Sequence, residues 1–172
     1  MTRLIRLTGL LPLAPAILSM ANLPAAQAAP PLDTRVVRAQ YSWGYLGPDG
    51  EGKGTLAVLV DAATGRVVLE LHGLGERLML LEGDRAKGYR VQIPRQKLDE
   101  QAPGLGGLPL PFLPRLGTPE ALRALITDGT GEGVKVTKKD AKGPVKLKYQ
   151  GKDDFGKDVQ VWLVRTRLDV SD

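Results

Sequence analysis

Apolar and polar residues alternate along much of the chain from residue 35 onward. An extended segment 35–46 would carry on one face Val37, Ala39, Tyr41, Trp43 and Tyr45. Segments 66–72 and 89–93 alternate in the same way, whereas 55–60 and 76–82 are apolar at successive positions. Alternation with period two predicts half-buried β-strands. Clusters rich in Gly, Asp and Pro separate these segments at 46–54, 61–65, 73–75 and 83–88, which predicts an antiparallel meander.

The second half of the chain continues the pattern after an interruption. Residues 95–101 can form one more strand, and strands are predicted at 133–138, 144–150 and 158–170. Between them, Thr118, Pro119 and Glu120 have the order of an N-cap, a first-turn proline and a first-turn acid. The helix that follows would end at 128–129, and its apolar face would carry Leu122, Leu125 and Ile126.

A mainly β fold follows, with one helix. Because several strands are apolar on both faces, we expect a strongly curved antiparallel sheet, an incomplete β-barrel, closed by a Leu/Pro-rich loop and the short helix. The interior would be lined by Trp43, Leu69, Leu80, Val91, Leu147 and Trp162.

The segment QAPGLGGLPLPFLPRLG (101–117) is unusually apolar for a connection, since connections normally run over the surface. We interpret it as a lid over an apolar cavity, with Gly104, Gly106 and Gly107 as a hinge. The helix would pack behind the lid residues, which are Leu105, Leu108, Leu110, Phe112 and Leu113. The alternative is a loop that plugs an ordinary solid core.

The first 28 residues have the layout of a secretory signal peptide. Arg3 and Arg6 precede an apolar run that two prolines interrupt, and the segment ends in Ala26-Gln27-Ala28, an A-x-A cleavage pattern. We therefore expect cleavage after Ala28, a single domain over 29–172, and a soluble monomer in the periplasm or outside the cell. The whole chain has a formal net charge of +5 and no cysteine, which excludes disulfides and thiolate sites.

The sequence offers little catalytic chemistry. His72 is the only histidine, and the serine nearest to it in sequence, Ser42, lacks the tight turn that exposes a nucleophile. Segment 153–158 does not fit a calcium loop. We expect no enzyme activity, catalytic residue, metal or cofactor. An enzyme acting on a polysaccharide or lipid remains an alternative, and its carboxylates would come from Glu70, Glu76 and Glu82.

Lysines are concentrated in the predicted hairpin KVTKKDAKGPVKLKYQGK (135–152). One interpretation is docking on an anionic membrane surface or an envelope partner protein. The residues chosen for this role are Lys138, Lys139, Lys146 and Lys148. The other interpretation is a solvated face whose lysines protect edge strands. Nucleic acid is not expected, because only Tyr149 is available for stacking there.

Together, the segments YSWGYL, GTLAVLVD, GRVVLELHG, ERLMLLEGD, KGYRVQIP, GLPLPFLPRLGTPEALRALI and VQVWLVRTRLDV resemble in layout the periplasmic lipoprotein carriers of the LolA/LolB type. The resemblance implies an incomplete barrel whose cavity holds acyl chains of lipoproteins during transfer across the envelope. The chain departs from the family in having one clear helix, and the family's lid-gating arginine has no placed counterpart. The alternative function is a non-enzymatic structural or interaction domain of the envelope with a solid core.

Overall fold

Strands make up most of the described chain and pair in one antiparallel sheet. The structure, a computed structural model, describes residues 35–48, 50–109, 117–152 and 156–171. The strands are β1 (Val36–Gly47), β2 (Gly50–Asp61), β3 (Arg66–Gly73), β4 (Glu76–Asp84), β5 (Gly88–Ile93), β6 (Leu98–Ala102), β7 (Val134–Asp140), β8 (Gly143–Lys152) and β9 (Asp158–Ser171). Between β5 and β7 lie the short 3₁₀ turns η1 (Pro94–Gln96) and η2 (Leu105–Gly107) and the helix α1 (Pro119–Thr127).

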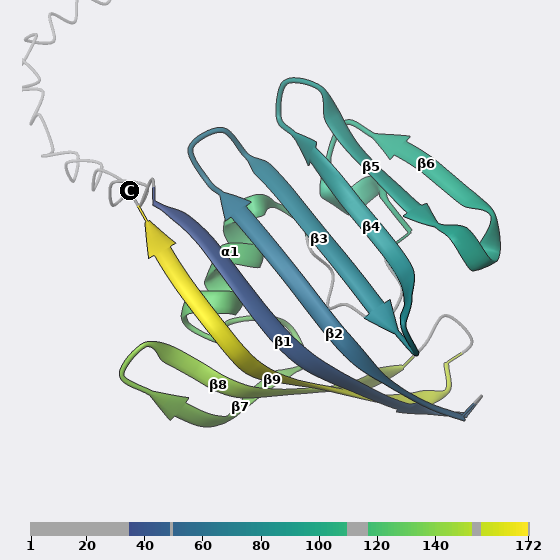
Figure 1. Cartoon of the computed structure of the whole chain (residues 1–172), viewed down its shortest axis with the longest axis vertical. Helices are drawn as coiled ribbons and strands as arrows, with labels where there is room; N and C mark the ends of the chain where they lie inside the picture. The colour runs from purple at the N-terminus through teal and green to yellow at the C-terminus, as the bar shows by residue number, and fades with distance from the viewer. Residues whose placement is uncertain (1–34, 49, 110–116, 153–155, 172) are drawn as a thin grey trace, which may run out of the picture. The chain divides into compact units, whose positions relative to one another are not determined.

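The strand order is β6-β5-β4-β3-β2-β1-β9-β8-β7, so the sheet is open and its edges are β6 and β7. The predicted mainly β fold with a curved, unclosed antiparallel sheet and one short helix is confirmed. The last strand, β9, lies inside the sheet between β1 and β8. In Figure 1 the helix lies behind β1 and β2, and the β7–β8 hairpin turns below them.

The two faces of the sheet differ in their cover. The face that α1 covers, here the inner face, carries residues that pair across neighbouring strands, such as Ala39, Val58, Leu69, Leu81 and Val91. These five residues are buried. The opposite outer face carries their sequence neighbours, most of them polar or charged. The alternation that predicted the strands therefore also separates the core from solvent.

Bulges change which residues face the core. The register of β3 and β4 shifts between Leu71 and His72, so that Leu78 has no partner of its own. A second shift, between Gln40 and Tyr41, leaves Thr166 of β9 unpaired opposite β1. Because an extra residue inverts the alternation along a strand, each bulge moves the residues beyond it to the other face.

The helix begins and ends where the sequence predicts. Thr118 is the N-cap, its hydroxyl accepts a hydrogen bond from the Ala121 amide at 3.2 Å, and Pro119 is the first helical residue. At the other end the Gly129 amide donates to carbonyls of the last turn, and Gly129 has a φ of +76°. This left-handed residue ends the helix as a glycine C-cap does.

One predicted turn is wrong in extent. Residues 46–54 were expected to be a turn because of their glycines, yet β2 begins at Gly50 and includes Gly52 and Gly54. A Cβ on Gly54 would lie 1.8 Å from the His72 carbonyl oxygen, and one on Gly52 would lie 3.3 Å from the indole of Trp43. These glycines allow the His72 carbonyl and the Trp43 indole to lie close to the β2 backbone. Close approach of this kind is a known reason for glycine inside a strand.

Candidate functional site

The inner face of the sheet is the main apolar surface of the protein. Among the described residues, the buried side chains are aliphatic or aromatic, tyrosines included. No charged residue is fully buried there. The face runs from Val91 and Ile93 on β5 to Leu147 on β8, so it extends across nearly the whole sheet. An apolar surface of this width has to be covered to be stable in water.

The cover consists of α1 and the turn η2. Leu122, Leu125 and Ile126 of the helix and Leu105 and Leu108 of the turn are all buried in the same hydrophobic cluster as the inner face. The helix contacts β2 and β8, which are separated in the sheet by β1 and β9. The nine-residue helix thus lies across the middle of the inner face, from β2 to β8.

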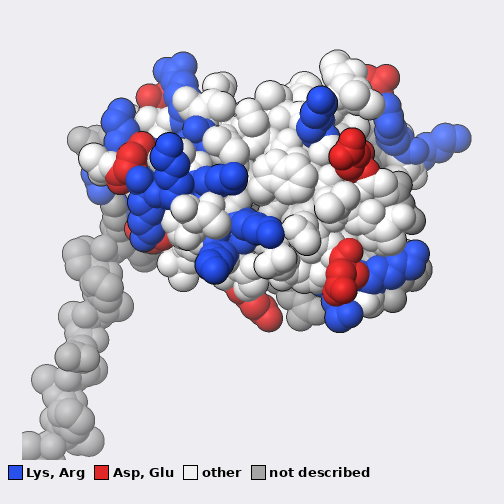
Figure 2. Space-filling model, turned by 90° about the horizontal axis from the view of Figure 1, so that it is seen from below, with Lys and Arg blue, Asp and Glu red and all other residues white. Residues whose placement is uncertain are grey.

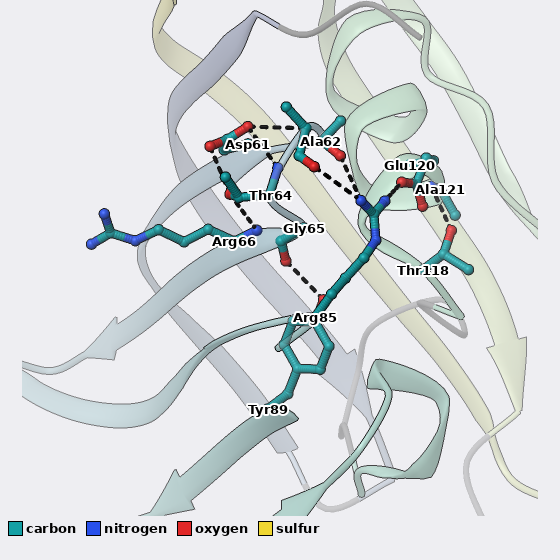
Figure 3. Close-up of polar contacts among 11 residues, drawn as sticks. Asp61, Ala62, Thr64, Gly65, Arg66, Arg85, Tyr89, Thr118, Glu120 and Ala121 are labelled. Atoms are coloured by element: carbon teal, nitrogen blue, oxygen red, sulfur yellow. Dashed lines mark hydrogen bonds and ion pairs between the residues drawn. The ribbon is translucent and has the colours of Figure 1, made fainter. Parts of the chain in front are cut away.

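Arg85 fastens the N-terminal end of this helix (Figure 3). Its guanidinium donates to the carbonyl oxygens of Ala62 and Ala63, at 3.0 and 3.2 Å, and forms an ion pair with Glu120 in the first helical turn. Next to it the Tyr89 hydroxyl donates to the Gly65 carbonyl at 2.7 Å. The β2–β3 turn is thereby tied to the helix by polar contacts at the edge of the apolar cluster.

Arg165 fastens the β7–β8 turn near the other end of the helix. Its side chain is only 5% exposed, and it donates to both carboxylate oxygens of Asp140 at 2.6 Å. The hydrogen bond from Arg165 holds the pKa of Asp140 below its usual value. Gly143 in the same turn approaches the helix end so closely that a Cβ there would lie 2.5 Å from the Thr127 carbonyl oxygen.

Tyr41 carries a buried polar group on the inner face. It is 2% exposed, and its hydroxyl has no hydrogen-bond partner among the described residues. Burial raises the pKa of Tyr41 to about 12, partly opposed by the charge of Arg165 on the neighbouring strand. A buried hydroxyl without a partner is costly, so this atom is a candidate contact for a polar group of a ligand.

The structure places most, but not all, of the predicted interior residues on the inner face. Trp43, Leu69, Val91 and Leu147 lie there, and Leu69, Val91 and Leu147 are fully buried. The predicted lid residues Leu110, Phe112 and Leu113 lie outside the described residues.

The placements of Leu80 and Trp162 were wrong. Leu80 pairs with Glu70 and Gln92, and Trp162 pairs with Lys148 and Gly44, so both lie on the outer face. The bulge at Leu78 inverts the alternation in β4. In β9 the residues on both sides of Trp162 are apolar. The large size of the tryptophan side chain therefore could not decide whether it points to the inner or the outer face.

The predicted glycine hinge at Gly104, Gly106 and Gly107 stays a prediction. Gly104 has an extended backbone with a φ of −141°, and Gly106 and Gly107 do not have positive φ values. None of the three therefore adopts a backbone conformation that only glycine favours in this structure.

Two open pockets lie away from the helix. The first, about 290 Å³, is on the outer face over Ala57, Leu59 and Val68, with charged residues including Arg38 and Arg167 at its rim. The second, about 360 Å³, lies beside the β3–β4 turn and includes His72 and Leu74. Among the described residues, no predicted lid or interior residue lines either pocket.

The lysines of the predicted docking site lie on the β7–β8 hairpin. Lys138 is opposite Lys146 on the outer face, Lys148 lies on the same face, and Lys139 pairs instead with Pro144 beside the turn. Lys135 belongs to the same lysine-rich hairpin in the sequence but was not among the four predicted docking residues; it lies opposite Lys148. Lys135 and Lys138 flank a bulge, and this bulge, which the sequence does not signal, brings both lysines to one face.

The three carboxylates considered for catalysis have separate partners. Glu70 contacts His72 at 3.1 Å and Arg77 at 3.9 Å, and Glu76 binds Arg95 at 2.7 Å. Glu82 pairs across the sheet with Arg90. Within the described ranges, no group of three His, Cys, Asp or Glu side chains is arranged to hold a metal ion.

Tyr41, Arg85 and Arg165 were not among the residues predicted from the sequence to form the site. Arg165 carried a weak signal, since it interrupts an apolar stretch of β9.

No family model matches the chain, and the search of curated proteins finds no match. In the part of the chain that the structure describes, no helix has both the length and the apolar character needed to cross a membrane.

Proposed function

We propose that the protein is an exported carrier that binds lipoprotein acyl chains, or other hydrophobic cargo, against the inner face of its open sheet. One observation carries this proposal. A wide apolar face is covered at its centre by a nine-residue helix and the turn η2, and Arg85 forms an ion pair with Glu120 at the N-terminal end of this helix. The layout of the sequence, which resembles LolA/LolB-type carriers, and the N-terminal signal pattern support the same proposal.

The unpartnered hydroxyl of Tyr41 adds a chemical detail. Acyl chains in lipids and lipoproteins are joined through ester or amide carbonyls, which accept hydrogen bonds. Tyr41 can donate to such a carbonyl from within the apolar face, which would remove the cost of its missing partner. Straight acyl chains would then lie along the apolar residues on either side of it.

A fluorescent fatty acid tests this function, together with native mass spectrometry of protein purified from an envelope fraction. We expect saturable probe uptake and a bound lipid or lipopeptide mass. Leu108→Gln introduces a polar group at the border of the cluster, where Leu108 is 8% exposed, and should weaken probe binding several-fold. The matched control is Leu74→Gln, because Leu74 is 84% exposed and should not matter.

A structural or interaction domain with a solid core is the second candidate. It is favoured by the continuous cluster that the inner face forms with Leu105, Leu108 and the helix, and by the position of both pockets outside that cluster. A clean apo mass with no probe uptake would support it. So would a Leu108→Gln variant that loses stability in urea without any change in probe binding.

A further inference from the structure

The outer face of the β7–β8 hairpin carries lysines placed directly opposite one another. Lys135 pairs with Lys148, and Lys138 pairs with Lys146. Like charges in directly opposed positions destabilise a sheet. Within the described residues, none of these four lysines takes part in an ion pair that would compensate. The repulsion between these lysines therefore lowers the stability of the folded protein, and a bound external anion would reduce it.

An aromatic surface adjoins these lysines. Trp162 is next to Lys148 across β8 and β9, and beyond it lie Gly44 and then Lys53. The indole lies directly against Gly44, because a Cβ on that glycine would be 2.1 Å from the ring atom Cε2. Trp162 remains partly exposed. In the next row, Val164 is opposite Lys146, so an apolar strip runs beside the charges.

We propose that this surface, the cationic face formed by Lys135, Lys138, Lys146, Lys148 and Trp162, docks the protein on an anionic lipid bilayer. Figure 2 shows Lys and Arg side chains gathered on the side of the molecule where the β7–β8 hairpin lies. Lysines near a membrane surface are attracted by its negative potential, and tryptophan favours the headgroup region. A sheet face presents both groups side by side to a bilayer.

Other anionic partners fit this surface less well. A single-stranded nucleic acid stacks its bases on several aromatic rings in succession, whereas Trp162 is the only tryptophan on this face. Among the described carboxylates of these strands, Asp158 is bound to Lys152 and Asp140 is bound to Arg165 rather than to the lysines of the cationic face. The proposal is independent of acyl-chain binding, because the cationic face and the covered inner face are on opposite sides of the sheet.

Vesicle co-sedimentation of the full mature chain tests the proposal. Vesicles of pure phosphatidylcholine are compared with vesicles containing phosphatidylglycerol, over a range of NaCl concentrations. We expect binding to the anionic vesicles alone, declining as salt rises. Lys146→Gln/Lys148→Gln should weaken it about tenfold or more and flatten its salt dependence. The charge-matched control Lys87→Gln/Lys97→Gln changes two exposed lysines outside the cationic face and should leave binding nearly unchanged.

Trp162→Ala separates the aromatic contribution from the charges. It should weaken vesicle binding while the salt dependence stays as in the native protein. Circular dichroism confirms that each variant is folded before its binding is interpreted. The proposal is overturned if the native protein does not bind phosphatidylglycerol vesicles at low salt. It is also overturned if Lys146→Gln/Lys148→Gln and the control Lys87→Gln/Lys97→Gln weaken vesicle binding equally. Tighter binding to single-stranded nucleic acid or to an acidic peptide than to vesicles would also overturn it. Failure of fatty-acid uptake, by contrast, would leave vesicle docking unaffected.

Discussion

The indole of Trp162 occupies the space above Gly44 where any other residue would carry its Cβ. The two residues are cross-strand partners on β9 and β1, and they lie on the outer face. The other tryptophan, Trp43, packs in a similar way over glycines on the inner face, where its Nε1 donates to the His72 carbonyl at 2.8 Å. Each large ring is thus accommodated by missing side chains on a neighbouring strand.

Replacing Gly44 with alanine should destabilise the protein by about 1–3 kcal/mol, the usual range for inserting a group into an occupied space. The displaced indole should also show red-shifted fluorescence. Urea unfolding measures the first effect. Gly104→Ala is the control, because its backbone is extended and the site is open, so we expect no loss or a small gain. Equal stabilities of the two variants would contradict the packing of Trp162 on Gly44.

The faces of the strands could be predicted only where one face is polar. In β1, alternation with Arg38 and Gln40 placed Tyr41 and Trp43 correctly. In β4, the run Leu78-Met79-Leu80-Leu81 is apolar throughout, and the pairing had to be counted from the β3–β4 turn.

That count fails because of a bulge. Without it Leu80 would face Leu69, as predicted, but the extra residue Leu78 brings Leu81 to that position. A bulge depends on local backbone geometry, for which the residues here give no separate signal. The candidate docking surface was found in part, because lysine clustering is visible in the sequence. Its tryptophan was assigned to the core, since size was taken as a guide to burial.

The β3–β4 turn offers a stabilising substitution. Its two central residues, Leu74 and Gly75, have φ values of 53° and 83°, as a type I′ turn requires. Leucine is unfavourable in this left-handed region, and here it is almost fully exposed. Leu74→Asn should therefore raise the free energy of unfolding by about 0.5–1 kcal/mol. Thermal or urea unfolding checks this. Leu74→Val, with a branched Cβ, should instead lower it.

Tyr41 should make stability depend on pH in the alkaline range. Its pKa in the folded protein is raised to about 12, above the usual tyrosine value of about 10. The folded state therefore holds this proton more tightly than the unfolded state. The resulting stability is complete below pH 10 and is lost as the pH rises from about 10 to 12, with a total loss of about 2–3 kcal/mol.

Tyr41→Phe provides the matched comparison. At neutral pH it should be neutral or stabilising, because the hydroxyl it removes has no partner in the described structure. Between pH 10 and 12 its urea midpoint should fall less than that of the native protein. Some alkaline loss remains, since burial also raises the pKa of Tyr89. Parallel pH profiles for the two proteins would disprove the burial of Tyr41.

The opposed lysines should weaken the fold that carries them. Lys148→Gln removes the repulsion with Lys135 and should increase stability by about 0.2–1 kcal/mol at low salt. The gain should shrink in 1 M NaCl, where exposed charges are screened. Lys87→Gln serves as the control and should change stability little under either condition. A loss of stability in Lys148→Gln would show that this lysine has a favourable contact in the folded protein.

The position of β9 between β1 and β8 governs when the protein can fold. β1 obtains its second neighbour from β9, so the two halves of the sheet cannot join until residues 158–171 are available. Pairings between distant segments form slowly, because a long loop must close first. In a chain emerging from a ribosome or a translocation pore, the sheet would remain incomplete until β9 is released. Completion of the sheet therefore reports the arrival of residues 158–171, and removal of β9 would separate β1 from β8 and leave two unjoined halves.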